Sequence, residues 1–504
     1  MNGDMILILD FGGAQSHSVA RKVRGEKVYC EVLPFDAPIE RVRGRNPKGI
    51  ILVGGSGDAF APGAPDCDPA VYSSGLPMLA IGYGSRALLR AMGGRSRGPA
   101  LTRQTMEVSF SPSPLFTGLT ASERFIERLD LIDLPEGFSP IASGVADGGG
   151  LTAAFSFEEK KLYGMQFSAE QNDPDGLAIL ANFARGIAGC APWWSMDVFI
   201  EQEVARIRER VGGGSALMGI SGGVDSAVCA ALMHRAIGRR MHCVYVDTGL
   251  MRKGETELVR RLFGEQMDMQ LVVVDARERF LARLAGVTDP DQKRRAIGDE
   301  FVRAFEDEAR TIGHVEFLVQ GTIYPDVIQS FGATDSLMMG ARGDAPLFEA
   351  VLEPVRALFK DEVRQVGEAL GMSREIVGRQ PFPGVGLALR CVGEVTERKL
   401  ATLREADAIF REEIEAAGLD RRIWQYFAVL TDMRSVGVAP GGREYGQVVA
   451  LRAVSSVDAT TAIAYRLPYD LLERVVSRIT AEAPDVARVV YDVTGKPPAM
   501  IEWE

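Results

Sequence analysis

The stretch Gly219–Ser226, which reads Gly-Ile-Ser-Gly-Gly-Val-Asp-Ser, constrains the fold of this chain more than any other. An apolar run, residues 216–220, leads into it, and a helical pattern from Ala227 to Ile237 follows. A strand, a turn rich in glycine and serine and a helix start together form a phosphate cradle, because backbone N–H groups and the helix dipole converge on an anion. We therefore predict pyrophosphate binding by the small and polar residues of this turn: Ser221, Gly222, Gly223, Asp225 and Ser226.

Two details of the turn refine this prediction. Asp225 is suited to hold Mg²⁺ beside the phosphates, since Mg²⁺ prefers carboxylate and phosphate oxygens. No lysine follows the glycines, so the turn is not a Walker A loop.

Length and composition indicate the class of protein. A chain of 504 residues with 46% apolar and 25% charged residues is typical of a soluble protein of about three domains. The formal charge of −11 argues against a large nucleic-acid surface. No apolar span approaches the roughly 20 residues of a membrane helix. The six cysteines are scattered and only four histidines occur, which disfavours a zinc site. We expect a cytoplasmic protein with reduced thiols.

The first third of the chain alternates apolar runs with helical stretches, which predicts an α/β sheet domain that ends near Gly189. The segment 190–194, Cys-Ala-Pro-Trp-Trp, has the composition of a linker that docks aromatic rings on a neighbour. The expected strands are residues 5–9, 49–53, 77–81 and 162–167, and a helix is expected over 175–187.

The middle third predicts a doubly wound sheet, which binds ligands at the carboxyl ends of its strands. Asp247, Asp275 and the pair Gly321-Thr322 stand at those ends. The expected strands are residues 216–220, 242–247, 271–275 and 316–320, with helices over 255–267 and 298–311. The last 120 or so residues indicate a small α+β domain, with strands over 445–457 and 489–493 and a helix over 469–483.

Several stretches carry a resemblance to known proteins. The turn at 221–226 resembles the signature loop of the ATP pyrophosphatases, and the chain resembles the GMP synthase (glutamine-hydrolysing) family over nearly its whole length. The matching stretches are Asp-Phe-Gly at 10–12, then residues 221–226, 246–254, 286–294, 320–328, 358–364, 381–384 and 496–504.

This resemblance implies three parts and a reaction. The parts are a class I glutamine amidotransferase-like α/β domain over 1–190, an ATP-pyrophosphatase domain over 196–383, and a C-terminal dimerisation and nucleotide-binding domain over 384–504. In the family, ATP adenylates the C2 oxygen of XMP, and ammonia then displaces AMP.

The resemblance also implies site residues. Asp247 joins the residues that bind ATP, and the implied catalytic residues are Asp225, Lys360 and Asp326. Lysine and arginine are suited to a 5′-phosphate because charge-assisted hydrogen bonds to phosphate are strong, although Lys496 and Arg452 also fit a surface charge and a packed terminal strand. The residues implied for XMP are Arg294, Pro383, Gly384, Arg452, Lys496, Ile501 and Glu502.

The amidotransferase part departs from the family pattern. Gly82 stands where the family has its cysteine nucleophile, and glycine cannot form an acyl-enzyme. Ser168 stands where the family has its histidine, and a serine is a poor base near neutral pH. Only Glu170, which orients the histidine in the family, is present. We expect an inactive glutaminase.

The synthetase part departs as well, in the lid that closes over ATP and XMP in the family. The family's lysine and two histidines are absent from residues 331–340, where Leu337, Met338 and Met339 occur instead. Gln329 replaces a glutamate, and Gln380 and Val385 replace a histidine and a proline beside the 381–384 turn.

These features predict ATP-dependent amination of XMP with free ammonia. Amination at C2 would give GMP, and amination at C6 would give isoguanylate. We favour the C6 product because an altered lid would present the purine in another register. Two alternatives stay open: a non-catalytic nucleotide-binding scaffold or regulator, and a synthetase fed by a separate glutaminase.

Overall fold

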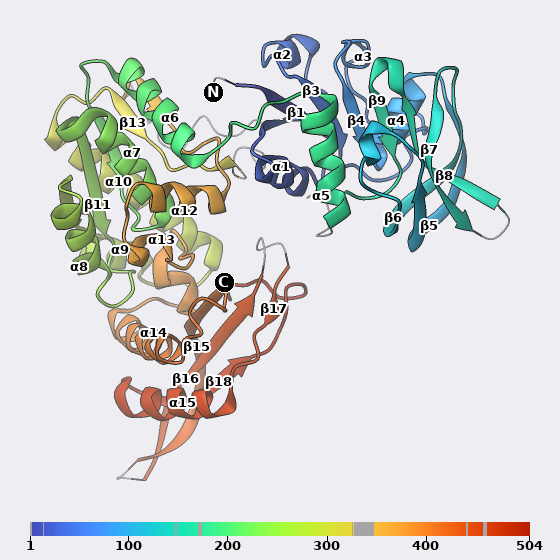
Figure 1. Ribbon diagram of the computed structural model, residues 1–504. Coiled ribbons are helices and arrows are strands. Elements are labelled where there is room, and N and C mark those ends of the chain that lie inside the picture. The colour runs from blue at the N-terminus through green and yellow to red at the C-terminus, as the bar shows by residue number, and fades with distance from the viewer. Residues whose placement is uncertain are drawn as a thin grey trace. The chain divides into compact units, whose positions relative to one another are not determined.

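The computed structural model describes residues 3–13, 15–146, 149–169, 174–324, 326, 347–439, 442–456 and 461–504. The chain forms two compact units. The first contains residues 1–202 with the short segments 323–334 and 357–359, and the second contains residues 203–322, 335–356 and 360–504. Figure 1 shows the helices and strands of both units.

The first unit is built on a nine-stranded sheet with the order β2-β1-β3-β4-β9-β8-β7-β5-β6. Its first five strands are parallel and apolar, as is usual for strands covered on both faces. They are β2 (Tyr29–Pro34), β1 (Met5–Asp10), β3 (Gly49–Val53), β4 (Met78–Ile81) and β9 (Leu162–Met165). The four strands predicted in this part of the chain are therefore confirmed.

The other four strands of that sheet are antiparallel and were not predicted. They are β8 (Gly149–Phe157), β7 (Ser139–Ala146), β5 (Arg95–Phe110) and β6 (Ala121–Asp133). The helices of the unit are α1 (Gln15–Gly25), α2 (Ile39–Arg43), α3 (Pro69–Tyr72), α4 (Tyr83–Ala91) and α5 (Pro174–Ala181), which continues as a π-helix over Asn182–Ile187.

The predicted linker docks on this unit. The Trp194 ring lies 4.7 Å from the ring of Tyr29, and the Trp193 ring lies 5.9 Å from it. Trp193 also donates a hydrogen bond through Nε1 to the Asp4 carbonyl at 2.7 Å. The helix α6 (Met196–Val211) follows and crosses from the first unit into the second.

The second unit contains a five-stranded parallel sheet with the order β12-β11-β10-β13-β14, as a doubly wound fold requires. Its strands are β10 (Ala216–Gly219), β11 (Met241–Asp247), β12 (Gln270–Asp275), β13 (Phe317–Val319) and β14 (Ala350–Leu352). The strand order reverses at β10, so the crevice between β10 and β13 is the place where such a fold binds ligands.

The helices around this sheet are α7 (Val224–Ile237), α8 (Glu255–Val259), α9 (Arg277–Leu284), α10 (Pro290–Ile312), α12 (Lys360–Ala369) and α13 (Arg374–Val377). Two predicted helices differ from the structure. The helix expected over 298–311 begins at Pro290, because Asp289 caps it by accepting the Gln292 N–H at 2.9 Å. The helix expected over 255–267 changes to a π-helix at Arg260.

The C-terminal part of the second unit is a four-stranded sheet beside two helices (Figure 1). The strands are β15 (Gln425–Ala439), β16 (Gly442–Ser455), β17 (Ile463–Ala464) and β18 (Val486–Asp492), and the helices are α14 (Glu397–Ala416) and α15 (Tyr469–Glu482). Leu403, Val449 and Val475 belong to one buried core with Leu217 and Phe305, so this sheet shares a core with the parallel sheet.

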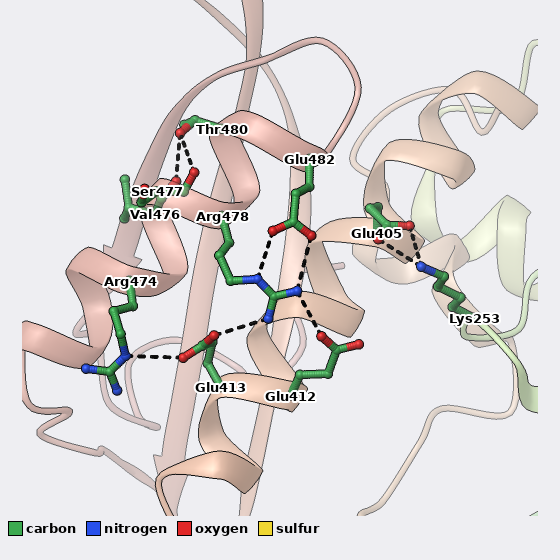
Figure 2. A network of polar contacts seen from close by, with 10 residues as sticks. All are labelled: Lys253, Glu405, Glu412, Glu413, Arg474, Val476, Ser477, Arg478, Thr480 and Glu482. Carbon is green, nitrogen blue, oxygen red and sulfur yellow. Dashed lines mark hydrogen bonds and ion pairs between the residues drawn. The ribbon is translucent and has the colours of Figure 1, made fainter.

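Charged side chains join α14 to α15. The Arg478 guanidinium donates to Glu413 at 3.1 Å, to Glu412 at 3.0 Å and to Glu482 at 2.9 and 3.1 Å (Figure 2). Arg474 donates to the other carboxylate oxygen of Glu413 at 3.3 Å. A separate pair in the same view, Lys253 with Glu405, links the turn after β11 to α14 at 2.8 Å.

Within the described ranges, no helix combines the length and the apolar character that a bilayer crossing needs.

Candidate active site

The turn after β10 forms the predicted cradle. Ile220 follows β10 and donates its N–H to the Val244 carbonyl of β11 at 2.8 Å. Gly222 then has φ = +77°, a conformation that favours glycine. Inside the turn, the Ser226 hydroxyl donates to the Gly223 carbonyl at 2.9 Å, and the Ser221 and Ser226 hydroxyls lie 3.2 Å apart. The turn therefore keeps a fixed, narrow shape.

Helix α7 begins at the end of this turn. Gly223 is its N-cap and supplies no side chain, so no side-chain oxygen caps the first turn of the helix. N–H groups in the first turn of a helix have no partners within the helix, which makes the position suited to an anion. The structure thus brings Ser221, Gly222, Gly223, Asp225 and Ser226 together.

Lys360 and Asp225 form an ion pair beside this turn. Lys360 is the first residue of α12, and Asp225 is in the first turn of α7. Their side chains are 35% and 27% exposed, so a ligand can reach both. The other carboxylate oxygen of Asp225, Oδ1, is buried without a hydrogen-bond partner in the described part of the chain.

The ends of two neighbouring strands lie close to this turn or to the turn that leads to α8. A Cβ on Gly321, just after β13, would lie 3.5 Å from the Ser226 nitrogen, so β13 ends against the start of α7. Asp247, at the end of β11, accepts the Gly249 N–H at 3.0 Å and the Thr256 hydroxyl at 3.0 Å. Its carboxylate therefore shapes the turn that leads to α8.

The chain's last residues fold against the 381–384 turn. Glu502 accepts two hydrogen bonds from Arg390, at 2.9 and 2.8 Å, and a third from the Gln425 amide at 3.1 Å. Gln425 also donates to the Pro381 carbonyl at 3.4 Å, which connects Glu502 to the turn that contains Pro383 and Gly384. Lys496 pairs with Ala462 through both backbone groups, at 2.7 and 3.0 Å.

The structure gives Arg452 a role that differs from the predicted phosphate contact. Its side chain is fully buried, and it donates to the Ile501 carbonyl at 2.8 Å, to Asp492 at 2.5 Å and to the Thr494 and Met500 carbonyls at 2.9 and 3.0 Å. The N–H groups of the guanidinium are thereby used in hydrogen bonds within the protein. Arg452 positions the tail that carries Ile501 and Glu502.

Arg294 and Asp326 have local partners in the structure. Arg294 is 43% exposed on α10 and pairs with Asp291 at 2.9 Å. Asp326 belongs to the first unit, where its carboxylate accepts the Ile323 N–H at 3.0 Å. The lid residues Gln329, Leu337, Met338 and Met339 lie outside the described residues.

Four charged residues of this region were missed by the sequence reasoning. Lys293 is fully buried and binds Glu504 and the Cys391 carbonyl, and Arg390 is fully buried with its guanidinium 4.0 Å from the Phe427 ring centre. Arg379 and Glu255 form an ion pair against the Gly222 carbonyl. A buried cation needs a partner, but its neighbours here are more than 20 residues away in the chain, so no local pattern reveals them.

Gly82 lies between β4 and α4 with φ = +59° and ψ = −115°. A sharp strand-to-helix turn of this kind exposes the residue at its apex, as a nucleophile elbow does. A Cβ on Gly82 would meet nothing within 4 Å, and Gly82 and Ser168 line one small pocket with Arg86, Arg128 and Glu127. The described residues around this pocket include no cysteine and no histidine. Glu170 lies outside the described residues.

Two arginines at this pocket, Arg86 and Arg128, have shifted pKa values. Burial lowers the pKa of the Arg86 guanidinium, and hydrogen bonds to Asp130 raise the pKa of Arg128. Burial also raises the pKa of the Cys67 thiol to about 12. The cysteines of the chain are free and buried, so none of them substitutes for a thiol at Gly82.

Family models match three successive parts of the chain. They describe a class I glutamine amidotransferase over residues 7–186, an NAD synthase over 195–426 and a GMP synthase C-terminal domain over 412–503. Together with the turn after β10, they define a synthetase joined to an amidotransferase-like domain.

Full-length relatives specify the family. The chain is 49% identical to "GMP synthase [glutamine-hydrolyzing]" of Caldicellulosiruptor saccharolyticus, with 100% of both chains covered. It is also 49% identical to the protein of that name in Symbiobacterium thermophilum, with 99% of both chains covered. It is 48% identical to the one in Thermomicrobium roseum, with 99% of this chain and 97% of that protein covered. The chain belongs to the GMP synthase family, and it is accordingly an ATP-dependent ligase that forms a C–N bond.

Proposed function

We propose that this chain aminates XMP through an adenylylated intermediate and takes free ammonia as its nitrogen source. The observation that carries the proposal is a contrast between two sites. The pyrophosphate turn with Asp225 and Lys360 is complete, whereas the elbow of the amidotransferase-like unit ends in Gly82 and has no nucleophile.

The ATP chemistry is assigned to the turn after β10. Backbone N–H groups of residues 222–226 and the hydroxyls of Ser221 and Ser226 bind the leaving pyrophosphate. Lys360 places its ammonium group beside the same turn, where it stabilises charge that develops on the phosphate oxygens. Asp247 keeps the turn after β11 in place.

The donor set fits Mg²⁺. Oδ1 of Asp225 is buried and has no hydrogen-bond partner among the described residues, which contain no cluster of three or more metal-ligating side chains. Mg²⁺ binds through one or two carboxylates together with substrate phosphates and water, so a single aspartate suffices. When bound, Mg²⁺ neutralises charge on the phosphate oxygens. Asp225 would hold it.

The nucleotide is assigned to the 381–384 turn and the tail. Pro383, Gly384, Lys496, Ile501 and Glu502 form this part of the site. Arg452 acts through the tail, and Asp326 and Arg294 remain proposed members. We place the domain boundaries at residues 1–190, 196–383 and 384–504.

Glutamine hydrolysis requires a nucleophile and a base. Gly82 supplies no side chain to the pocket that it shares with Ser168, which is the reason for proposing free ammonia, or ammonia from a separate donor. For the product we favour isoguanylate over GMP, because the lid lacks the family's lysine and histidines and Gln380 replaces a histidine.

We also propose a homodimer formed through the C-terminal sheet. The hairpin of β15 and β16 carries Val436, Val438 and Tyr445, which are 44%, 92% and 69% exposed. Val436 and Val438 share one face, and Tyr445 is directly opposite Val436. The same face carries Arg434 and Arg443, and Arg443 is directly opposite Val438. A second copy of the chain would cover the three exposed apolar side chains.

The test is an incubation of the purified chain with XMP, ATP, Mg²⁺ and ammonium, with glutamine in a parallel tube. Chromatography against GMP and isoguanylate standards identifies the product, and pyrophosphate release reports adenylation. We expect isoguanylate from ammonium and no product from glutamine. GMP would contradict the C6 assignment, product from glutamine would contradict the inactive glutaminase, and no pyrophosphate release would favour the scaffold.

A further inference from the structure

The ion pair of Arg379 and Glu255 contacts the backbone of the turn at residues 221–226, which is called the pyrophosphate turn here. Arg379 Nη1 donates to the Gly222 carbonyl at 2.6 Å, and Nη2 pairs with Glu255. The two side chains are only 15% and 6% exposed. A Cβ on Gly222 would lie 3.1 Å from Glu255 Oε1 and 3.3 Å from Arg379 Nη1, so the pair packs directly against the Gly222 backbone.

The backbone of Arg379 is itself anchored. Its N–H donates to the Ile376 carbonyl at 3.3 Å, and its carbonyl accepts from Arg364 at 3.4 Å. Arg364 is on α12, the helix that also carries Lys360. Hydrogen bonds to α12 and α13 therefore fix the backbone from which the Arg379 guanidinium extends to the turn.

The contact to the Gly222 carbonyl also orients an N–H group. The peptide unit is planar and trans, so the Gly222 carbonyl and the Gly223 N–H point in opposite directions. With the carbonyl bound to Arg379, the Gly223 N–H faces the interior of the turn, where it donates to the Ser221 hydroxyl at 3.3 Å. That bond is long, and a phosphate oxygen is a stronger acceptor.

We propose that Arg379, held by Glu255, is a positioning residue that presents the Gly223 N–H to the pyrophosphate of ATP. The cation also polarises the peptide and makes its N–H a stronger donor. Arg379 touches neither ATP nor XMP in this assignment. The inference rests on the proposed assignment of the pyrophosphate turn to ATP.

The test is titration of ATP with Mg²⁺ into the full chain by calorimetry, without XMP. Arg379→Ala should raise the dissociation constant of ATP by about tenfold or more, the effect of losing a hydrogen bond to a charged group. Guanidinium ion added to Arg379→Ala should restore part of the affinity, because the missing group is small and its site is preformed. Glu255→Gln should weaken ATP binding less than Arg379→Ala does.

The matched control is Arg374→Ala, because Arg374 is an exposed arginine on α13. It should bind ATP as the unmodified chain does. In turnover assays Arg379→Ala should raise the KM for ATP more than it lowers kcat, a split that a general loss of folded protein would not produce.

The outcomes separate two failures. An unmodified chain that binds no ATP would overturn the assignment of the turn and this inference with it. An unmodified chain that binds ATP, with Arg379→Ala matching Arg374→Ala, would overturn the inference alone. If Arg379→Ala does not fold, Arg379→Lys and Glu255→Gln provide the comparison, and unchanged ATP affinity in both would overturn it.

Discussion

Lys360 and Asp225 pair across 135 residues, each from the first turn of its own helix. The pair places one ammonium and one carboxylate beside the helix start that is suited to pyrophosphate, and the Asp225 Oδ1 atom has no partner within the described ranges. A cation and a carboxylate oxygen without a hydrogen-bond partner therefore lie beside the same turn.

Replacing Lys360 with Met should lower kcat for pyrophosphate release by about 100-fold or more, because a charge that stabilises the transition state is lost. Lys360→Arg should retain part of the activity. Steady-state kinetics with saturating XMP and ammonium test this. Lys253→Met, a lysine in an exposed pair, is the control and should leave kcat unchanged. Equal rates for Lys360→Met and the unmodified chain would contradict the role of Lys360.

Gly82→Cys should create a reactive thiol on a protein that otherwise has none. The native cysteines are buried, whereas a side chain at Gly82 has open space above it. Its positive φ makes the substitution destabilising by about 1–3 kcal/mol. Thiol titration of the folded protein near pH 8 should find no reactive group before the substitution and one after it. Gly82→Cys with Ser168→His should then release glutamate from glutamine, and a second reactive thiol in Gly82→Cys would contradict the burial.

The rate with ammonium should rise with pH near neutrality. Only the unprotonated amine attacks the adenylylated purine, and its fraction grows as pH rises. The measurement is the initial rate at constant total ammonium between about pH 6 and about pH 8, inside the range in which proteins are usually most stable. As a control, the rates from all pH values should fall on one rising line when they are plotted against the concentration of unprotonated ammonia. A rate that falls across this range would argue against ammonia as the nucleophile.

Val438→Lys and Tyr445→Lys should convert the proposed homodimer to monomers. Each replaces an exposed apolar side chain of the hairpin with a charge, which a partner copy would have to bury. Glu444→Lys, on the neighbouring position of β16, faces the other way and should leave the dimer intact. Light scattering after size-exclusion chromatography distinguishes the states. Dimers from both apolar-face variants would place the interface elsewhere.

Arg478→Met should lower the free energy of unfolding by about 1 kcal/mol, since it removes a guanidinium that serves three carboxylates. Lys253→Met removes a single exposed pair (Figure 2) and should lower it by about 0.5 kcal/mol or less. Denaturant titration at low salt measures both. High salt should reduce the difference by screening, and a larger loss for Lys253→Met would contradict the network's contribution.

The sequence was most informative where a buried apolar run meets a glycine-rich turn. Eight parallel strands were located within a few residues, because a strand covered on both faces has an almost continuous apolar pattern. They are β1, β3, β4 and β9 in the first sheet and β10, β11, β12 and β13 in the second. The hairpin of β5 and β6 was missed because many of its residues are exposed, so its pattern has no apolar run. The early start of α10 depended on the Asp289 cap, a local signal that the helical periodicity does not contain.

The candidate site was predicted unevenly for a similar reason. The pyrophosphate turn is local in sequence, so its residues could be named together. The contacts of Arg379 with Gly222 and of Arg390 with Glu502 join residues 157 and 112 positions apart. Arg452 illustrates a different limit, because a basic residue that contacts a phosphate and one that anchors a tail have the same identity in sequence. In the structure its side chain binds the Ile501 carbonyl.

The tail residues Glu502 and Glu504 act as internal counter-ions for Arg390 and Lys293, which are both completely buried. Removing the last four residues would leave two cations in the core without neutralisation, which is strongly destabilising. Folding of the core between α10 and β15 is thereby coupled to the docking of the same segment that is assigned to XMP. A protease that trims this segment would inactivate the chain by unfolding as well as by loss of the ligand site, and bound nucleotide should protect against both.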